Sequence, residues 1–209
     1  MIDQIKKGAN NFATYVKKII DDFFKWLEDL FRSGKADEVF EFVGSGGNLK
    51  YLKILSRNMV AQEHSMSCAA ACIRQLARDF GLELEERVIR EFARTTKQTG
   101  TFPDGILDGL KQVFKDKEIE AGIFYNPKIS DVDMAKSISK EGSWISIVRP
   151  NAGNSHAIII DKIQNGKVFI RDPWPIEGIG KGNGVEAIID ETEFATIWAQ
   201  GGNYVFKVK

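Results

Sequence analysis

The sequence contains very few histidines and cysteines. Its 209 residues include two of each, His64 and His156, and Cys68 and Cys72. Two cysteines in neighbouring turns cannot build a disulfide framework, because they would close only a trivial loop. They also lack further ligands at the spacing that a zinc site requires. We therefore predict a protein that works with reduced thiols and needs neither a metal nor a cofactor.

The sequence also lacks an excess of charge and a long apolar run. Lysine plus arginine and aspartate plus glutamate number 29 each, so no net field draws the chain toward nucleic acid or anionic lipid. No apolar segment approaches the roughly 20 residues that span a bilayer. The N-terminus has no secretion signal. We expect no nucleic-acid partner and no transmembrane segment, and a cytoplasmic location unless the chain is delivered elsewhere as part of a larger protein.

Two regions of different composition follow one another along the chain. Residues 2–31 carry apolar side chains at three- or four-residue steps, which predicts an amphipathic helix. Its mixed charges favour docking on protein over a membrane surface. The glycine-rich stretch "VGSGGN", residues 43–48, then breaks the pattern. We predict a helix and linker over residues 1–45 and a globular domain over residues 46–209.

The period of the hydrophobic pattern changes within this domain. Helical patterns come first, and the best defined is "CAAACIRQLARDFG", a helix that begins at Cys68 and that Gly81 ends. β-branched runs follow, and the hairpin signal "QNG" joins two of them. Helices followed by antiparallel strands predict an α+β fold. The further helices are expected at 84–94, 104–114, 130–140 and "ETEFATIWA", and the strands at 143–149, 156–163, 167–172, "VEAIID" and "NYVFKVK".

Cys68 is the candidate nucleophile. A thiol reacts as its thiolate, and the backbone N–H groups and dipole at a helix N-terminus stabilise that charge. Cys68 opens its predicted helix, whereas Cys72 lies one turn further in, where a small apolar residue packs in a core. The plainer interpretation, in which both thiols only fill space, stays open at this point.

The sequence offers this thiol one well-placed base. His156 starts a strand with a buried pattern, which would hold its ring rigidly, whereas His64 lies in the loop before Cys68 and is interpreted as a surface residue. The hairpin brings Asp172 back near the level of His156, where it can orient the ring. Turn formation before a proline is the alternative role of Asp172. Gln62 carries an amide that could donate to an oxyanion together with the backbone N–H of Cys68.

The order glutamine, cysteine, histidine, aspartate resembles that of papain-like cysteine peptidases. The spacing is most similar to the peptidase C39 group, the double-glycine leader peptidases of bacteriocin export and their stand-alone relatives. In that group a glutamine lies six residues before the cysteine, as Gln62 does here, and a short hairpin leads from the histidine to Asp-Pro, as in "HAIIIDKIQNGKVFIRDPW". The resemblance covers roughly residues 60–175. It implies a papain-like fold, catalytic roles for Gln62, Cys68, His156 and Asp172, and a protein or peptide substrate.

Two departures from the group limit what the resemblance implies. The group usually has aspartate before the cysteine and glycine after it, whereas this chain has Ser67 and Ala69. A preference for double-glycine substrates therefore does not carry over. Gly46 and Gly47 in the linker are a candidate self-cleavage site, although flexible linkers are rich in glycine for simpler reasons.

The architecture suggests a biological setting as well. An amphipathic helix, a glycine break and a papain-like domain are similar to the C-terminal toxin domains of bacterial polymorphic and contact-dependent systems. That similarity implies delivery into a target cell as part of a larger toxin, with an immunity protein as a partner.

Two other functions stay open on the sequence alone. Transglutaminases and glutamine deamidases use the same Cys-His-Asp order on a side-chain amide, although many carry an aromatic residue directly after the cysteine, where this chain has Ala69. A papain-like scaffold kept only for binding would need no reactive thiol, although such relatives usually lose the cysteine or the histidine.

Overall fold

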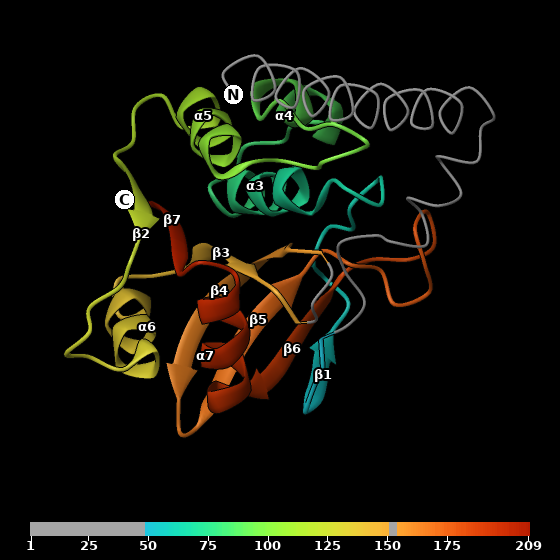
Figure 1. Cartoon of the computed structure of the whole chain (residues 1–209). Coiled ribbons are helices and arrows are strands. Elements are labelled where there is room, and N and C mark those ends of the chain that lie inside the picture. Colours follow the sequence, from blue (N-terminus) through green and yellow to red (C-terminus); the bar gives the residue numbers. More distant parts are fainter. Residues whose placement is uncertain (1–48, 151–153) are drawn as a thin grey trace, which may run out of the picture. The chain divides into compact units, whose positions relative to one another are not determined.

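The computed structural model describes residues 49–150 and 154–209 (Figure 1). The predicted helix at 2–31 and the glycine-rich stretch at 43–48, including Gly46 and Gly47, lie outside the described residues, so the domain boundary stays a prediction. Seven described strands form one antiparallel sheet. They are β1 (Lys53–Ser56), β2 (Ile119–Ile123), β3 (Trp144–Val148), β4 (His156–Gln164), β5 (Lys167–Asp172), β6 (Val185–Asp190) and β7 (Tyr204–Val208), in the spatial order β1-β6-β5-β4-β3-β7-β2.

Both faces of this sheet are buried by helices. Ile159 of β4 belongs to one hydrophobic cluster, and its neighbours Ile158 and Ile160 belong to the other, as the period of two along a strand requires. The first cluster includes side chains of α3 (Cys68–Asp79), α4 (Glu86–Phe92) and α5 (Pro103–Val113), and the second includes side chains of α6 (Asp131–Ser139) and α7 (Glu191–Gln200). Burial on both faces explains why the central strands are runs of β-branched residues without polar alternation.

Helix α3 is the element of the first layer that lies against the sheet. Its small residues Ala70, Ala71 and Ala77 are fully buried, so the helix backbone approaches β4 closely. Gly81, at φ +77°, adopts the left-handed conformation that ends a helix and that glycine reaches without strain. The predicted helix over "CAAACIRQLARDFG" is confirmed within one residue.

The hairpin between β4 and β5 positions two candidate site residues. Asn165 and Gly166 both have positive φ, 52° and 72°, as a two-residue type I′ turn requires. The ladder shifts register between Ile160 and Lys162, which marks Asp161 as a bulged residue. Because Ile159 pairs with Arg171, Asp172 lies diagonally across from His156 at the end of the strands.

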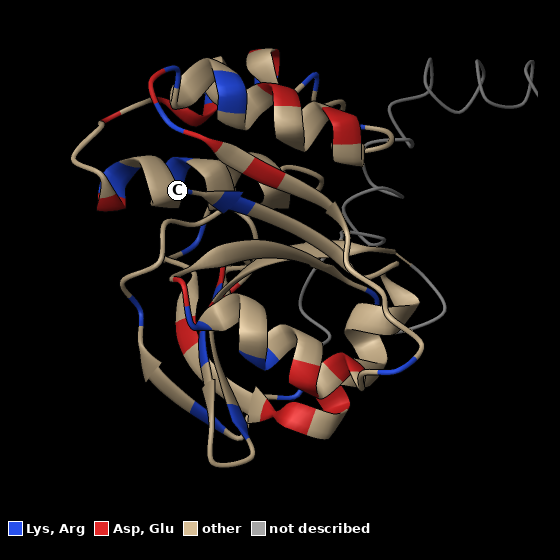
Figure 2. Ribbon diagram, turned by 90° about the vertical axis from the view of Figure 1, so that its left-hand side faces the viewer, with Lys and Arg blue, Asp and Glu red and all other residues tan. Residues whose placement is uncertain are grey.

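The predicted α+β fold is confirmed, with two strands more than the sequence pattern indicated. Strands β1 and β2 were not predicted, and they are the two edges of the sheet. No helix within residues 49–150 and 154–209 is long and apolar enough to cross a membrane. Acidic and basic positions both occur over the face that Figure 2 shows, on helices as well as strands, in keeping with their equal numbers in the sequence.

Candidate active site

The side chains of His156 and Asp172 form a buried pair at one end of the sheet. His156 Nε2 lies 2.7 Å from Asp172 Oδ1, and both side chains are fully buried. The backbone N–H of Trp174 donates to the same oxygen at 2.8 Å. This geometry commits Nε2 to the carboxylate and leaves Nδ1 as the ring nitrogen that can exchange a proton.

Cys68 is the first residue of α3, next to this pair. Its Sγ accepts a hydrogen bond from the backbone N–H of Ala157, the residue that follows His156, at 3.4 Å. The first N–H groups of a helix have no partner within the helix, and the dipole there favours negative charge. The predicted position of the thiol at a helix N-terminus, beside the histidine strand, is therefore present in the structure.

Opposing forces act on the pKa of His156. Burial penalises the charged imidazolium and lowers the pKa, but the charge and hydrogen bond of Asp172 raise it, and Cys68 raises it further. The result is a pKa of about 10. The imidazole is therefore protonated at neutral pH, which is the state that pairs with a thiolate.

Cys72 occupies a different environment from Cys68. It is fully buried in the first hydrophobic cluster, and its Sγ donates to the carbonyl oxygen of Ala157 at 3.4 Å. Burial raises the pKa of the Cys72 thiol well above its usual value, and the nearby Cys68 and Asp172 add to that effect. Cys72 is thus an uncharged packing residue, as its place one turn into the helix indicated.

Gln62 is buried in the loop that leads to Cys68. Its Nε2 donates to the carbonyl oxygens of His64 at 2.7 Å and of Ser65 at 3.0 Å. Its backbone N–H donates to Pro173 O at 2.9 Å, which joins the loop to the residue after Asp172. In this structure the amide holds the loop in shape, and its predicted role as an oxyanion donor stays a prediction.

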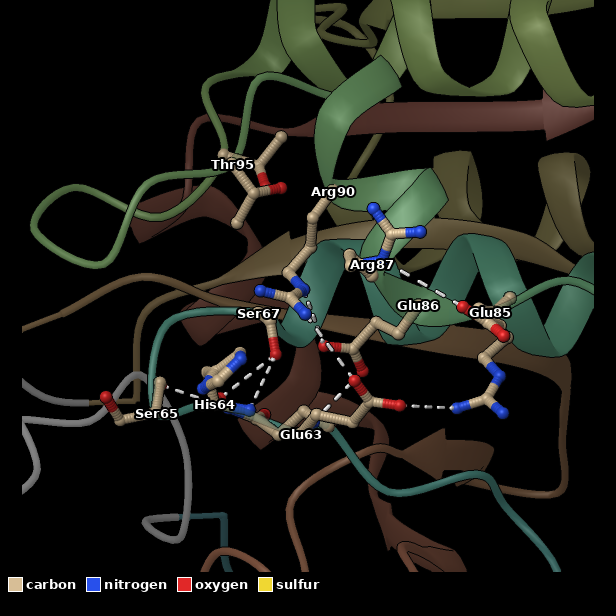
Figure 3. A network of polar contacts seen from close by, with 12 residues as sticks. Glu63, His64, Ser65, Ser67, Glu85, Glu86, Arg87, Arg90 and Thr95 are labelled. Carbon is tan, nitrogen blue, oxygen red and sulfur yellow. Dashed lines mark hydrogen bonds and ion pairs between the residues drawn. The ribbon is translucent and has the colours of Figure 1, made fainter.

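Helix α4 supports the same loop through a buried carboxylate (Figure 3). Glu86 Oε2 accepts the backbone N–H of Glu63 at 3.0 Å, and Glu86 Oε1 lies 3.4 Å from Arg90 Nε. Burial raises the pKa of Glu86 to about 7, and the nearby Ser67 hydroxyl and the hydrogen bond from the Glu63 backbone oppose the rise. Ser67, which stands where the resembling group usually has aspartate, is fully buried, and its Oγ bonds the backbone N–H and carbonyl of His64.

The other histidine lines a different pocket from Cys68. His64 lines a small separate pocket with Arg90 and Lys97. Burial lowers the pKa of His64, and the charges of Arg90 and Lys97 lower it further. His64 therefore lies among cations that disfavour its protonated form, and the prediction that it is not the catalytic base stays a prediction.

Cys68 and His156 both belong to the lining of one pocket of about 380 Å³. Its walls come from both layers of the fold. They include Ile106 from α5, Ile147 from β3 and Tyr204 from β7. This volume is within the range of ligand-binding pockets, and Cys68 belongs to the lining.

Two contacts of this region had no signal in the sequence. Tyr51, before β1, donates from its hydroxyl to Asp172 Oδ2 at 2.8 Å. Arg171 joins the two layers, because it binds Asp79 at the end of α3 at 2.5 Å and Asp161 of β4 at 2.8 Å. Both contacts link residues that are far apart in the chain, and neither forms a recognisable motif.

Three solved structures share the fold of this chain at low sequence identity. The peptidase domain of Streptococcus ComA, a bi-functional ABC transporter involved in quorum sensing, has TM-score 0.55 and 18% identity, over 73% of this chain and 98% of that one. A double glycine motif protease from an AMS/PCAT transporter, in complex with the leader peptide, has TM-score 0.53 and 14% identity, over 76% of this chain and 93% of that one. A C39-like peptidase from Bacillus anthracis has TM-score 0.55 and 12% identity, over 75% of this chain and 97% of that one. Among curated proteins, none matches this chain.

A family model matches most of the chain. The match is to the model described as Peptidase C39 family, and it extends over residues 56–206. It includes Gln62, Cys68, His156 and Asp172, the residues on which the resemblance was based. The shared fold and this match together show that the chain belongs to the peptidase C39 family.

Proposed function

We propose that this cysteine peptidase hydrolyses peptide bonds with Cys68 as nucleophile, His156 as general acid and base, and Asp172 as the residue that orients His156. The observation that carries the proposal is the shared pocket. Cys68 and His156 both line it, while Asp172 binds the ring nitrogen on the far side at 2.7 Å. Cys72 is sealed in the core and cannot take the role of Cys68.

The reaction follows from the protonation states of this pair. The Cys68 thiolate attacks the carbonyl carbon, and the His156 imidazolium gives its proton to the leaving amine as the peptide bond breaks. The resulting thioester is attacked by water, from which neutral His156 takes a proton. The C–S bond then breaks, which releases the acid product and restores the thiolate–imidazolium pair. We assign the backbone N–H of Cys68 to the oxyanion, with Gln62 as the second predicted donor.

A peptide segment is the substrate that the comparisons favour. The double glycine motif protease among the similar structures is in complex with a leader peptide, and the pocket here has room for peptide side chains. The toxin role, delivery into a target cell and the immunity partner stay predictions from the sequence.

Thiol labelling with mass mapping tests the proposal. We expect iodoacetamide near pH 7 to label Cys68 rapidly and to leave Cys72 unlabelled, because Cys72 is fully buried. His156→Ala should slow the labelling of Cys68 at least tenfold, since the thiolate loses its counter-ion. Cys72→Ala is the matched control and should label like the wild type.

Slow labelling of Cys68 in the wild type would instead favour a papain-like binding scaffold. Where labelling is fast, mass spectrometry of treated peptides separates peptidase from deamidase. Cleavage splits the chain, whereas deamidation leaves it whole and adds about one mass unit.

A further inference from the structure

We propose that Tyr51 is a positioning residue of this active site, which holds the Asp172 carboxylate so that one oxygen faces His156. This inference rests on the proposed function and adds a fourth residue to the line from Cys68 to Asp172. Tyr51 lies before residue 56, where the family match begins, so the contact is supplied by a segment outside that match.

The hydrogen bonds around Asp172 carry the proposal. Oδ1 lies 2.7 Å from His156 Nε2 and accepts the backbone N–H of Trp174 at 2.8 Å, while Oδ2 accepts the Tyr51 hydroxyl at 2.8 Å. A carboxylate that is held at both oxygens cannot turn about its Cβ–Cγ bond. Tyr51 is thus the side chain that satisfies the oxygen that His156 does not use, in a site where Asp172 is fully buried and an unpartnered oxygen would be costly.

The backbone around Tyr51 is fixed to the same part of the sheet. The next residue, Leu52, donates its N–H to Ile188 O at 2.7 Å, and β1 then pairs with β6. Strand β6 pairs in turn with β5, with Val185 opposite Asp172. The Tyr51 ring packs against the second hydrophobic cluster. Position and orientation of the hydroxyl are therefore set by strand pairing and packing, as a positioning role requires.

The groups around the Asp172 carboxylate set the environment in which His156 titrates. They are His156 on β4 and the phenol of Tyr51, which bind the carboxylate directly, and the Cys72 thiol of α3, which interacts with it electrostatically. Arg171, the preceding residue on β5, is engaged by Asp79 and Asp161. Burial raises the pKa of Tyr51 far above its usual value, and the charge and hydrogen bond of Asp172 add to the rise, so the phenol remains a donor throughout the range in which His156 titrates.

A histidine NMR titration of the full chain tests this role. The chain has only two histidines, so ¹⁵N-histidine labelling gives two imidazole titrations. In Tyr51→Phe we expect the midpoint of His156 to fall by about 0.5 to 1 pH unit, because a carboxylate that is free to turn supports the imidazolium less well. His64 should not move, since its shift has other causes, and serves as the internal reference.

The matched control is Tyr125→Phe, which removes a hydroxyl from an exposed tyrosine and should leave both midpoints unchanged. With a peptide substrate, Tyr51→Phe should lower kcat by about three- to tenfold with little change in KM, since Tyr51 does not line the pocket. Continued protection of the buried Cys72 from iodoacetamide verifies that the variant is folded.

An unchanged His156 midpoint and unchanged kcat in folded Tyr51→Phe would overturn the positioning role while leaving the proposed function intact, provided that Cys68 of the wild type labels rapidly. An ordinary His156 midpoint together with slow labelling of Cys68 in the wild type would overturn the proposed function, and the role of Tyr51 with it.

Discussion

His156 shows how a buried ionisable residue contributes to stability and chemistry together. Its pKa in the folded chain is about 10, against an ordinary 6.5. A group whose pKa is raised by folding stabilises the fold fully below the unfolded value and loses that contribution as the pH rises through the folded value. The contribution of His156 is therefore present below about pH 6.5 and disappears progressively toward pH 10.

We accordingly expect the free energy of unfolding to decline between pH 6.5 and 10, because the unfolded chain releases the His156 proton first. Urea denaturation at several pH values measures this slope. His156→Asn should flatten it, whereas His64→Asn, at a histidine whose pKa is lowered, should leave it in place. A wild-type stability that does not vary over this window would contradict the raised pKa.

Gln62 is the residue for which sequence and geometry suggest different roles. The predicted oxyanion donor needs an N–H that points to the reacting carbonyl, but both N–H groups of the amide bind loop carbonyls in this structure. Catalysis by Gln62 would require one of these bonds to be shared or released when substrate binds.

We expect Gln62→Ala to lower kcat by roughly 10²–10³, as the loss of an oxyanion donor does. Gln62→Glu is the informative companion, because it keeps the shape but replaces the donor by a carboxylate. Peptidase kinetics and thermal melting should be measured on the same samples. A lower melting temperature with unchanged kcat would assign Gln62 to loop structure alone.

At the scale of elements, the site depends on how helix α3 is held against the sheet. Cys68 lies at one end of α3 and Asp79 at the other. Arg171 connects that far end to the sheet through Asp79 and Asp161. The bulge at Asp161 breaks the regular alternation of β4, and bulges commonly redirect a side chain near an active site.

Arg171→Met should therefore destabilise the fold and also loosen the position of Cys68 at the start of α3. We expect a loss of about 2 kcal/mol, below the roughly 3–5 kcal/mol for a fully buried pair, because the carboxylates of Asp79 and Asp161 are 35% and 33% exposed. Arg87→Met is the matched control, since its pair with Glu91 is exposed and should contribute under about 0.5 kcal/mol. Urea denaturation measures the free energy of unfolding of both variants. Equal losses in the two would show that Arg171 does not hold α3 against the sheet.

The parts of the fold that the sequence predicts are those with local signals. The turn at Asn165 and Gly166, the end of α3 at Gly81 and the buried β-branched runs all carry their information in neighbouring residues. Edge strand β1 was missed because three of its four residues are exposed, and β2 because none of its five is fully buried. Strand β1 shows no apolar alternation, and the short alternation in β2 includes Gly122, a residue type that is depleted in strands.

The candidate site divides in the same way. Cys68 and His156 were found because each begins a regular element, and Asp172 because a short hairpin returns it to His156. Tyr51 was missed because 121 positions separate it from Asp172 in the chain, and its position depends on strand pairing that the sequence does not reveal. The amide partners of Gln62 were also unforeseen, because they are backbone carbonyls of an irregular loop.

At the scale of the whole molecule, the site lies where two layers meet. Cys68 belongs to the helical layer, whereas His156 begins β4 and Asp172 ends β5 of the sheet. Neither layer alone therefore contains all three candidate catalytic residues. The family match over residues 56–206 includes both layers but not β1 as a whole, nor Tyr51. Tyr51 and most of β1 therefore lie before the part of this chain that the family model matches.

Two shortened chains test how much of the segment before residue 58 the candidate site requires. A chain that begins at residue 49 retains Tyr51, β1 and every described contact of the site, so we expect rapid labelling of Cys68 and unchanged turnover. A chain that begins at residue 58 lacks β1, which leaves the edge of β6 unpaired, and lacks the hydroxyl on Asp172. It should label Cys68 more slowly and melt at a lower temperature. If the longer of the two were also inactive, residues within 1–48 would be part of the working peptidase.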